Sequence, residues 1–82
     1  MAVRMGRDIA DKLRSSIKEQ RVRRRISQTK AAAMVGRTRK WLSEYERGNL
    51  DPATGVVFAL AHGLGVVIEI SLPAEFEDNP KV

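Results

Sequence analysis

Cysteine is absent from this chain of 82 residues, and histidine occurs only once. The lack of cysteine excludes disulfides and thiolate metal sites, and it is compatible with a protein that resides in a reducing compartment of the cell. His62 has no second histidine or thiol with which to share a metal ion, so we expect no metal site and favour a role for it at a helix C-terminus. The chain also lacks a set of nucleophile, histidine and acid, and a glycine-rich phosphate loop. We therefore expect neither catalysis nor a cofactor.

Long apolar runs are also missing. The first residues, MAVRMGRDIADKL, lack the uninterrupted apolar stretch of a signal peptide. The most apolar segment, residues 56–70, is interrupted by two glycines, a histidine and a glutamate, whereas a membrane span needs about 20 apolar residues. We therefore expect a soluble, cytoplasmic protein that makes no membrane contact.

Acidic residues are scarce in the first part of the chain. Residues 1–48 carry fourteen basic and five acidic side chains, whereas residues 49–82 carry one basic and five acidic, so the net charge of +5 divides into +9 and −4. A concentrated positive field favours a polyanionic partner. With 43% hydrophobic residues, a chain of this length suits one small domain whose core is marginal and would gain from self-association. The composition therefore predicts a basic domain that forms a homodimer.

Residues 8–24 form the first predicted helix. Apolar side chains recur there every four positions, at Ile9, Leu13 and Ile17, and charged side chains occupy the rest of the helical wheel. Residues 1–7 precede it as an N-terminal arm, for which a short edge strand at residues 2–5 is the alternative.

Two shorter helices, at residues 28–35 and 39–47, are predicted on either side of Gly36. Ser27 and Thr38 stand where a hydroxyl can cap the first turn of each helix. Gly36 can end the first of them in the left-handed backbone conformation, which costs glycine nothing sterically. This is the layout of a helix-turn-helix DNA reader. The predicted inward-facing residues are Ala31, Ala32, Val35, Leu42 and Tyr45.

A fourth helix and a strand complete the predicted domain, which spans residues 8–72. Asp51 and Pro52 have the residue types of an N-cap and a first helical position, and Val57, Leu60 and Ala61 continue the apolar pattern. Residues 66–72 then alternate as a strand does. The side chains that share its apolar face, and that we assign to dimerisation, are Val66, Ile68, Ile70 and Leu72.

The predicted strand lacks an obvious partner, and its own copy in a second subunit is the simplest one. We therefore predict that two copies pair antiparallel across a homodimer. Residues 73–82 follow as an acidic, proline-containing tail that we expect to be flexible.

The outward face of the predicted helix at residues 39–47 is cationic. Arginine and lysine on a helix in the major groove can donate to the O6 and N7 atoms of guanine, so Arg39 and Lys40 are the first candidates for base contact. Ser43 and Glu44 are secondary candidates for base contact. Glu44 either accepts a hydrogen bond from cytosine or holds Lys40, four residues before it, in an ion pair, and we favour the ion pair. The candidates for phosphate contact from charge and position are Arg25, Lys30, Arg37 and Thr38, with Arg23 and Arg24 as further cations.

Short groups of residues stand at fixed offsets between residues 27 and 48. They are Ser27-Gln28, Ala32, Gly36, Thr38-Arg39, Leu42-Ser43 and Glu46-Arg47-Gly48. These groups match the pattern SQ, A, G, SR, IS and ERG at unchanged spacing, and through them the chain resembles the lambda-repressor-like helix-turn-helix family, also called the XRE family. The resemblance covers roughly residues 3–72. It implies an all-α fold of four to five helices, with the short C-terminal strand joining a homodimer on an inverted-repeat DNA operator.

The resemblance also assigns roles to particular residues. Gln28 matches the family position that grips a DNA phosphate, and Arg21 and Glu46 match the positions of an internal ion pair. Arg37 departs from the family, which has an aliphatic residue after the hinge glycine, so this charged side chain must turn to solvent or to a phosphate. Trp41 either packs against the fourth helix or the dimer partner, or touches a thymine methyl or a sugar at the edge of the groove, and packing is favoured.

The wider frame is similar to HipB-type antitoxins within that family. It includes Val3-Arg4, Trp41-Leu42-Ser43-Glu44 and the segment LGVVIEI. This likeness implies a repressor that controls its own operon and binds a HipA-like kinase toxin. The alternatives are a stand-alone phage or bacterial repressor without a toxin, and an adaptor that uses the helix-turn-helix only for protein contact.

Overall fold

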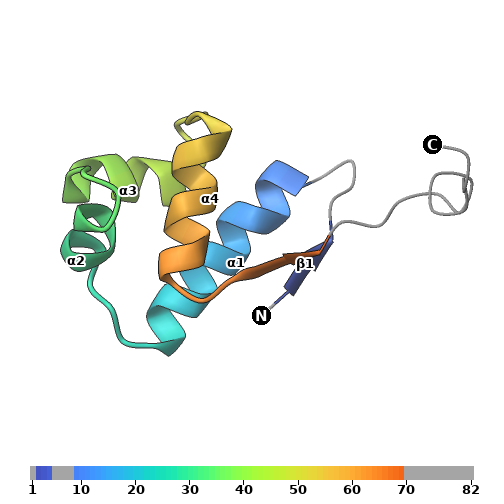
Figure 1. The fold of residues 1–82 in the computed structure, drawn as a ribbon. Coiled ribbons are helices and arrows are strands. Elements are labelled where there is room, and N and C mark those ends of the chain that lie inside the picture. Colours follow the sequence, from blue (N-terminus) through green and yellow to red (C-terminus); the bar gives the residue numbers. More distant parts are fainter. Residues whose placement is uncertain (1, 5–8, 70–82) are drawn as a thin grey trace, which may run out of the picture.

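The computed structural model describes residues 2–4 and 9–69 of the chain. Its elements, in order, are β1 (Ala2–Arg4), α1 (Ile9–Arg23), α2 (Gln28–Ala33), α3 (Arg39–Glu46), α4 (Thr54–Gly63) and β2 (Val67–Glu69). The helices pack into one bundle, and the two short strands lie at the end of the bundle away from α2 and α3 (Figure 1). The described fold is therefore an all-α helix-turn-helix domain with a small appended sheet.

The core lies where the predicted apolar faces of the four helices meet. Ile17 of α1, Leu42 of α3 and Leu60 of α4 are fully buried, and Leu64 joins them just after α4. Small residues on α2 let that helix approach its neighbours closely. The complete set of buried residues is Leu13, Ile17, Ala31, Ala32, Leu42, Tyr45, Val57, Leu60, Ala61, Leu64 and Val66. The predicted inward faces are confirmed, with Ile9 and Val35 partly buried at the margin.

All four helices end in the same hydrogen-bonded turn. A residue two or three positions after the end of each helix has a positive φ, and the next backbone N–H donates to a carbonyl five residues back, which is the Schellman motif. The positive-φ residues are Arg25 (56°), Gly36 (67°), Gly48 (83°) and Gly65 (79°). The closing bonds run from Ile26 to Arg21, Arg37 to Ala32, Asn49 to Glu44 and Val66 to Ala61. The predicted hinge at Gly36 is confirmed, and Arg25 is the only non-glycine residue with a positive φ in the described part of the chain.

The two predicted hydroxyl caps are confirmed, whereas the predicted start of α4 is wrong. The hydroxyl of Ser27 accepts from the backbone N–H of Lys30, and that of Thr38 accepts from Trp41, each at 3.1 Å. Asp51 does not cap α4, which begins at Thr54 after an N-cap residue that makes no side-chain hydrogen bond. Pro52 instead lies half-buried at a groove of about 170 Å³ lined by α1 and α4, so the extended connection runs past it before the helix starts.

The strand β2 has a partner within its own chain, which corrects the premise that it stands alone. It pairs in parallel with β1, in the register Ala2 with Val67, Val3 with Ile68 and Arg4 with Glu69. The alternative of an N-terminal edge strand is thus confirmed for residues 2–4.

The predicted alternation of side chains along this strand holds where it is described. Val66 is buried, Ile68 is half-buried against the core, and Val67 points outward with 57% of its surface exposed. Val66 and Ile68 therefore already contribute to the core of their own chain. Ile70, Leu72 and the tail at residues 73–82 lie outside the described residues.

Candidate nucleic-acid interface

The helix α3 turns one face to the core and the other to solvent. Leu42 and Tyr45 are buried, whereas Arg39 and Lys40 at its N-terminal end are exposed. Within residues 2–4 and 9–69, neither of these two cations forms an ion pair. Both remain available to an external ligand, and their contact with bases remains a prediction.

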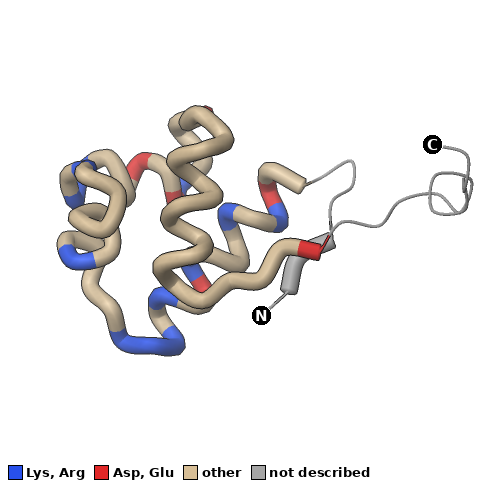
Figure 2. Tube along the Cα trace, viewed as in Figure 1, with Lys and Arg blue, Asp and Glu red and all other residues tan. Residues whose placement is uncertain are grey.

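The exposed cations extend beyond α3. Figure 2 shows basic positions along the connection from α1 to α2, on α2 and around the hinge before α3, on the same side of the bundle. Arg25, Lys30 and Arg37 are all exposed there. This cationic side lies away from the acidic C-terminal end of β2 (Figure 2).

Two further arginines, at the end of α1 and just after it, are engaged within the chain. Arg23 pairs with Glu19 at 2.9 Å, and Arg24 donates from Nη1 to the carbonyl of Leu64 at 3.0 Å. Arg24 thereby satisfies a carbonyl at the end of α4, which is a structural contact.

Glu44 does not tether Lys40, so that interpretation was wrong. Its carboxylate accepts from the side-chain amide of Asn49 at 2.7 Å and lies 3.7 Å from a guanidinium nitrogen of Arg47. The Schellman turn at Gly48 folds Asn49 back toward the last turn of α3, which brings the amide within reach. Ser43 and Glu44 are both half-buried at the flank of the exposed face.

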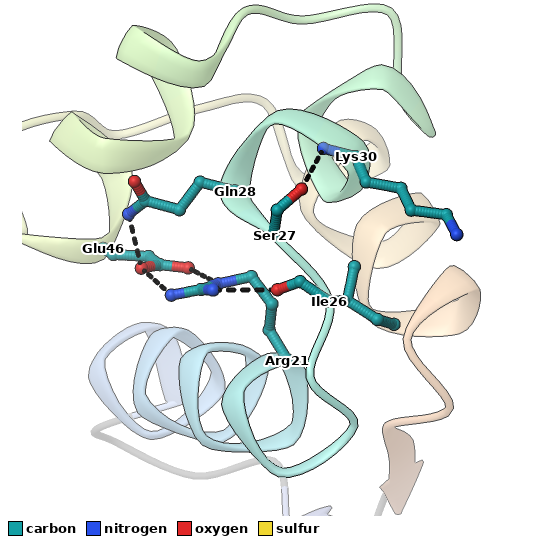
Figure 3. A network of polar contacts seen from close by, with 6 residues as sticks. All are labelled: Arg21, Ile26, Ser27, Gln28, Lys30 and Glu46. Atoms are coloured by element: carbon teal, nitrogen blue, oxygen red, sulfur yellow. Dashed lines mark hydrogen bonds and ion pairs between the residues drawn. The ribbon is translucent and has the colours of Figure 1, made fainter.

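A buried polar network joins α1, α2 and α3 (Figure 3). Arg21 donates from Nε and Nη2 to the two carboxylate oxygens of Glu46, at 2.7 and 3.0 Å, and from Nη1 to the carbonyl of Ile26 at 2.9 Å. The side chains of Arg21 and Glu46 are only 12% and 3% exposed. The predicted ion pair is confirmed, and it fixes the end of α3 against α1.

Gln28 belongs to this network, which sequence reasoning did not anticipate. Its side-chain Nε2 donates to Glu46 at 3.0 Å, so that nitrogen points inward (Figure 3). The sequence offered no signal for this contact, because Gln28 and Glu46 lie on different helices. Its role as a phosphate contact remains a prediction.

Aromatic and cationic side chains stack beside the hinge. The rings of Trp41 and Tyr45 lie 5.7 Å apart between centroids at an interplanar angle of 12°, and the guanidinium carbon of Arg37 lies over the Trp41 ring at 5.9 Å. Trp41 is half-buried against the core, so the packing interpretation is confirmed, with Tyr45 of the same helix as its partner. Arg37 is exposed and turns to solvent, as its charge requires.

The phenol of Tyr45 is held in its neutral form. Burial raises the pKa of Tyr45 from 10.0 to about 12, Arg14 opposes that shift, and Glu46 adds to it. The ring therefore supports Trp41 as an uncharged group at physiological pH.

Two helices joined at a left-handed glycine, with the second helix fixed to a core and cationic outside, define a helix-turn-helix DNA-binding domain. The chain belongs to the helix-turn-helix domain family, whose model matches residues 12–69. No curated protein matches the chain. In the part of the chain that the structure describes, each helix is too short or too polar to cross a membrane.

Proposed function

We propose that this protein is a sequence-specific transcriptional repressor that binds an inverted-repeat operator in double-stranded DNA as a homodimer. The observation that carries this proposal is the outward projection of Arg39 and Lys40 from a helix whose other face is locked in the core. A helix fits the major groove, and each good bidentate contact there gives about 1–3 kcal/mol of discrimination between bases.

The rigidity of α3 supports reading of sequence over simple attraction to polyanions. The Arg21–Glu46 pair holds the end of the helix, and the Thr38 cap holds its start. Side chains on a fixed helix present their donors in a reproducible register, whereas a mobile basic segment contacts phosphates without regard to sequence.

Binding to selected and scrambled duplexes tests the proposal. A preferred duplex is selected from a random-sequence pool, and affinity is measured by fluorescence anisotropy for it and for a scrambled duplex of equal composition. We expect Arg39→Ala to weaken binding to the selected duplex by about 1–3 kcal/mol and to the scrambled duplex much less. Equal affinity of the unaltered protein for both duplexes would contradict the proposal.

Lys30→Ala serves as the comparison, because Lys30 is exposed on α2 and is assigned to a phosphate. Loss of a phosphate contact weakens binding to all DNA sequences alike and lowers the slope of log affinity against log salt by about 1. A change confined to the selected duplex would show that Lys30 reads bases.

A second proposed role, as antitoxin, rests on the strand that follows α4. The likeness to HipB-type antitoxins implies a strand at this place, and β2 lies there. We propose that the repressor binds a HipA-like kinase toxin through a surface other than α3. Co-expression with a kinase-like protein encoded beside it should give a complex that still binds the operator. Failure of the two to co-purify would leave the stand-alone repressor as the function.

A further inference from the structure

We propose that Trp41 is a positioning residue that holds the Arg37 guanidinium against a DNA phosphate at the edge of the major groove. The inference rests on the proposed function, and it assigns a joint role to Trp41 and to Arg37, the charged residue that follows the hinge glycine. Arg37 follows the hinge glycine directly, and its guanidinium carbon lies 5.9 Å from the centroid of the Trp41 ring.

The contact is anchored step by step in the core. Tyr45 is buried, the Trp41 ring lies nearly parallel to it at 5.7 Å, and the exposed Arg37 lies over the Trp41 ring. Each ring limits the positions open to the next group, so the outermost group is held although solvent surrounds it. A side chain that is ordered before binding loses less conformational entropy when it meets its ligand.

The chemistry of the held group suits a phosphate. The guanidinium carbon of Arg37 lies 5.9 Å from the centroid of the Trp41 ring, within the range of a cation–π contact, and the five N–H donors of the guanidinium remain open to a second ligand. Arginine binds phosphate in this forked geometry. No ion pair engages Arg37 within residues 2–4 and 9–69, so its charge is available.

The position of Arg37 also points to a phosphate. It precedes Thr38, which caps the N-terminus of α3, and it stands next to Arg39 and Lys40. The N-terminus of a helix attracts anions, and base contacts are assigned to the residues that follow. Arg37 is therefore placed beside the reading residues, where it can fix the register of α3 on the DNA backbone.

A double-mutant cycle on the full chain tests whether Trp41 acts through Arg37. The variants are Arg37→Gln, Trp41→Leu and the two combined, measured by anisotropy with labelled selected and scrambled duplexes at a temperature where circular dichroism shows every variant folded. We expect Arg37→Gln to weaken binding to both duplexes about fivefold and to lower the slope of log affinity against log salt by about 0.9. Trp41→Leu should weaken binding about threefold when Arg37 is present and have no effect in the Arg37→Gln background.

Three further variants separate positioning from packing and from charge. Trp41→Phe keeps a flat ring and should restore most of the affinity lost in Trp41→Leu. Arg37→Lys keeps the charge without the planar fork and should fall between the unaltered protein and Arg37→Gln. Lys18→Gln removes an exposed positive charge from α1 and should leave the salt slope unchanged.

The outcomes distinguish this inference from the proposed function. If Trp41→Leu weakens binding equally in both backgrounds, Trp41 acts independently of Arg37 and the inference is overturned. If Arg37→Gln lowers the affinity for the selected duplex alone, Arg37 contacts a base and the phosphate assignment is wrong. If the unaltered protein does not distinguish the two duplexes, the proposed function fails, whatever the cycle shows.

Discussion

At the scale of single residues, Arg25 occupies a backbone conformation that glycine occupies at the other three helix ends. An L-residue in the left-handed region carries a steric cost of roughly 1–2 kcal/mol. Its side chain is exposed and makes no ion pair among the described residues, so within them the cost is offset only by the backbone hydrogen bonds of the turn, from Arg25 to Val22 and from Ile26 to Arg21. The proposed phosphate contact would give arginine a role at this position, because backbone strain is tolerated where function requires a residue.

Arg25→Gly should therefore raise the free energy of unfolding by about 1 kcal/mol, since it relieves the strained φ. Urea denaturation followed by circular dichroism measures this change. Arg25→Ala is the matched control, because it removes the same charge but keeps a Cβ in the left-handed region. Equal stability of the two variants would show that charge repulsion, and not backbone strain, is what glycine relieves.

Tyr45 makes stability depend on pH in the alkaline range. Its pKa is raised to about 12 in the folded protein from 10.0, mainly by burial. Because the folded pKa is higher, the unfolded chain loses this proton first as the pH rises. The contribution to stability is therefore complete below pH 10 and is lost progressively as the pH approaches about 12.

We expect the unaltered protein to lose about 2–3 kcal/mol of stability from Tyr45 over this range. Tyr45→Phe keeps the stacked ring and removes the titrating group, so its stability should fall less steeply with pH than that of the unaltered protein. Denaturant midpoints measured at intervals from pH 8 to pH 12 give the comparison. Parallel curves for the two proteins would show that Tyr45 ionises as easily in the folded state as in the unfolded chain.

At the scale of elements, the orientation of α3 depends on the polar network at its C-terminal end. Removing one partner of a buried ion pair leaves the other charge buried and uncompensated, which costs about 3–5 kcal/mol. Glu46→Ala leaves Arg21, which is only 12% exposed, without its carboxylate partner. We expect a loss of stability near the lower end of that range, because Ile26 still accepts from Arg21.

The combined variant Arg21→Met with Glu46→Leu tests the cause of that loss. It replaces both charges by apolar side chains of similar volume, and it should recover most of the stability lost in Glu46→Ala. Urea denaturation of the two variants measures the recovery. If the combined variant is as unstable as Glu46→Ala, the buried charge is not the source of the loss.

The elements also show which features the sequence could predict. The hinge at Gly36, the caps at Ser27 and Thr38, and the apolar faces of the helices follow from neighbours within a few residues, so they were predicted correctly. The predicted start of α4 was wrong, because Pro52 packs at a groove that α1, which is distant in sequence, helps to form. The pairing of β1 with β2 and the bond from Gln28 to Glu46 join distant segments in the same way. The hydrogen-bond partner of Glu44 was not predicted, because the turn at Gly48 brings the side chain of Asn49 to its carboxylate.

At the scale of the whole molecule, the cationic helices and the small sheet lie at different ends of the bundle (Figures 1 and 2). A repressor of an inverted repeat presents two recognition helices about 34 Å apart, so its interface between copies must lie away from the DNA. The sheet at the opposite end satisfies this requirement. Among the described residues each strand is paired along one edge, and we propose that the other edge of β2 pairs with that of a second copy.

Val67→Asp tests this interface. Val67 is 57% exposed, so an aspartate there should leave the monomer core intact. Across a paired edge it would face the outward side chains of the partner strand, among which Glu69 of the partner subunit is acidic. A cross-strand pair contributes about 0.2–1 kcal/mol, and two-fold symmetry repeats each lost pair, so we expect the dimer dissociation constant to rise about tenfold.

Val22→Asp is the matched control, because Val22 is 56% exposed and belongs to α1, not to either strand of the sheet. Analytical ultracentrifugation gives the dimer dissociation constant of each variant. Val67→Asp should also bind the operator more weakly than the unaltered protein does, because a monomer contacts only one half-site. If the two variants dimerise equally well, the interface lies elsewhere. The groove beside the exposed Leu50 and Phe58 then becomes the next surface to alter, since it too carries apolar side chains that the described fold leaves uncovered.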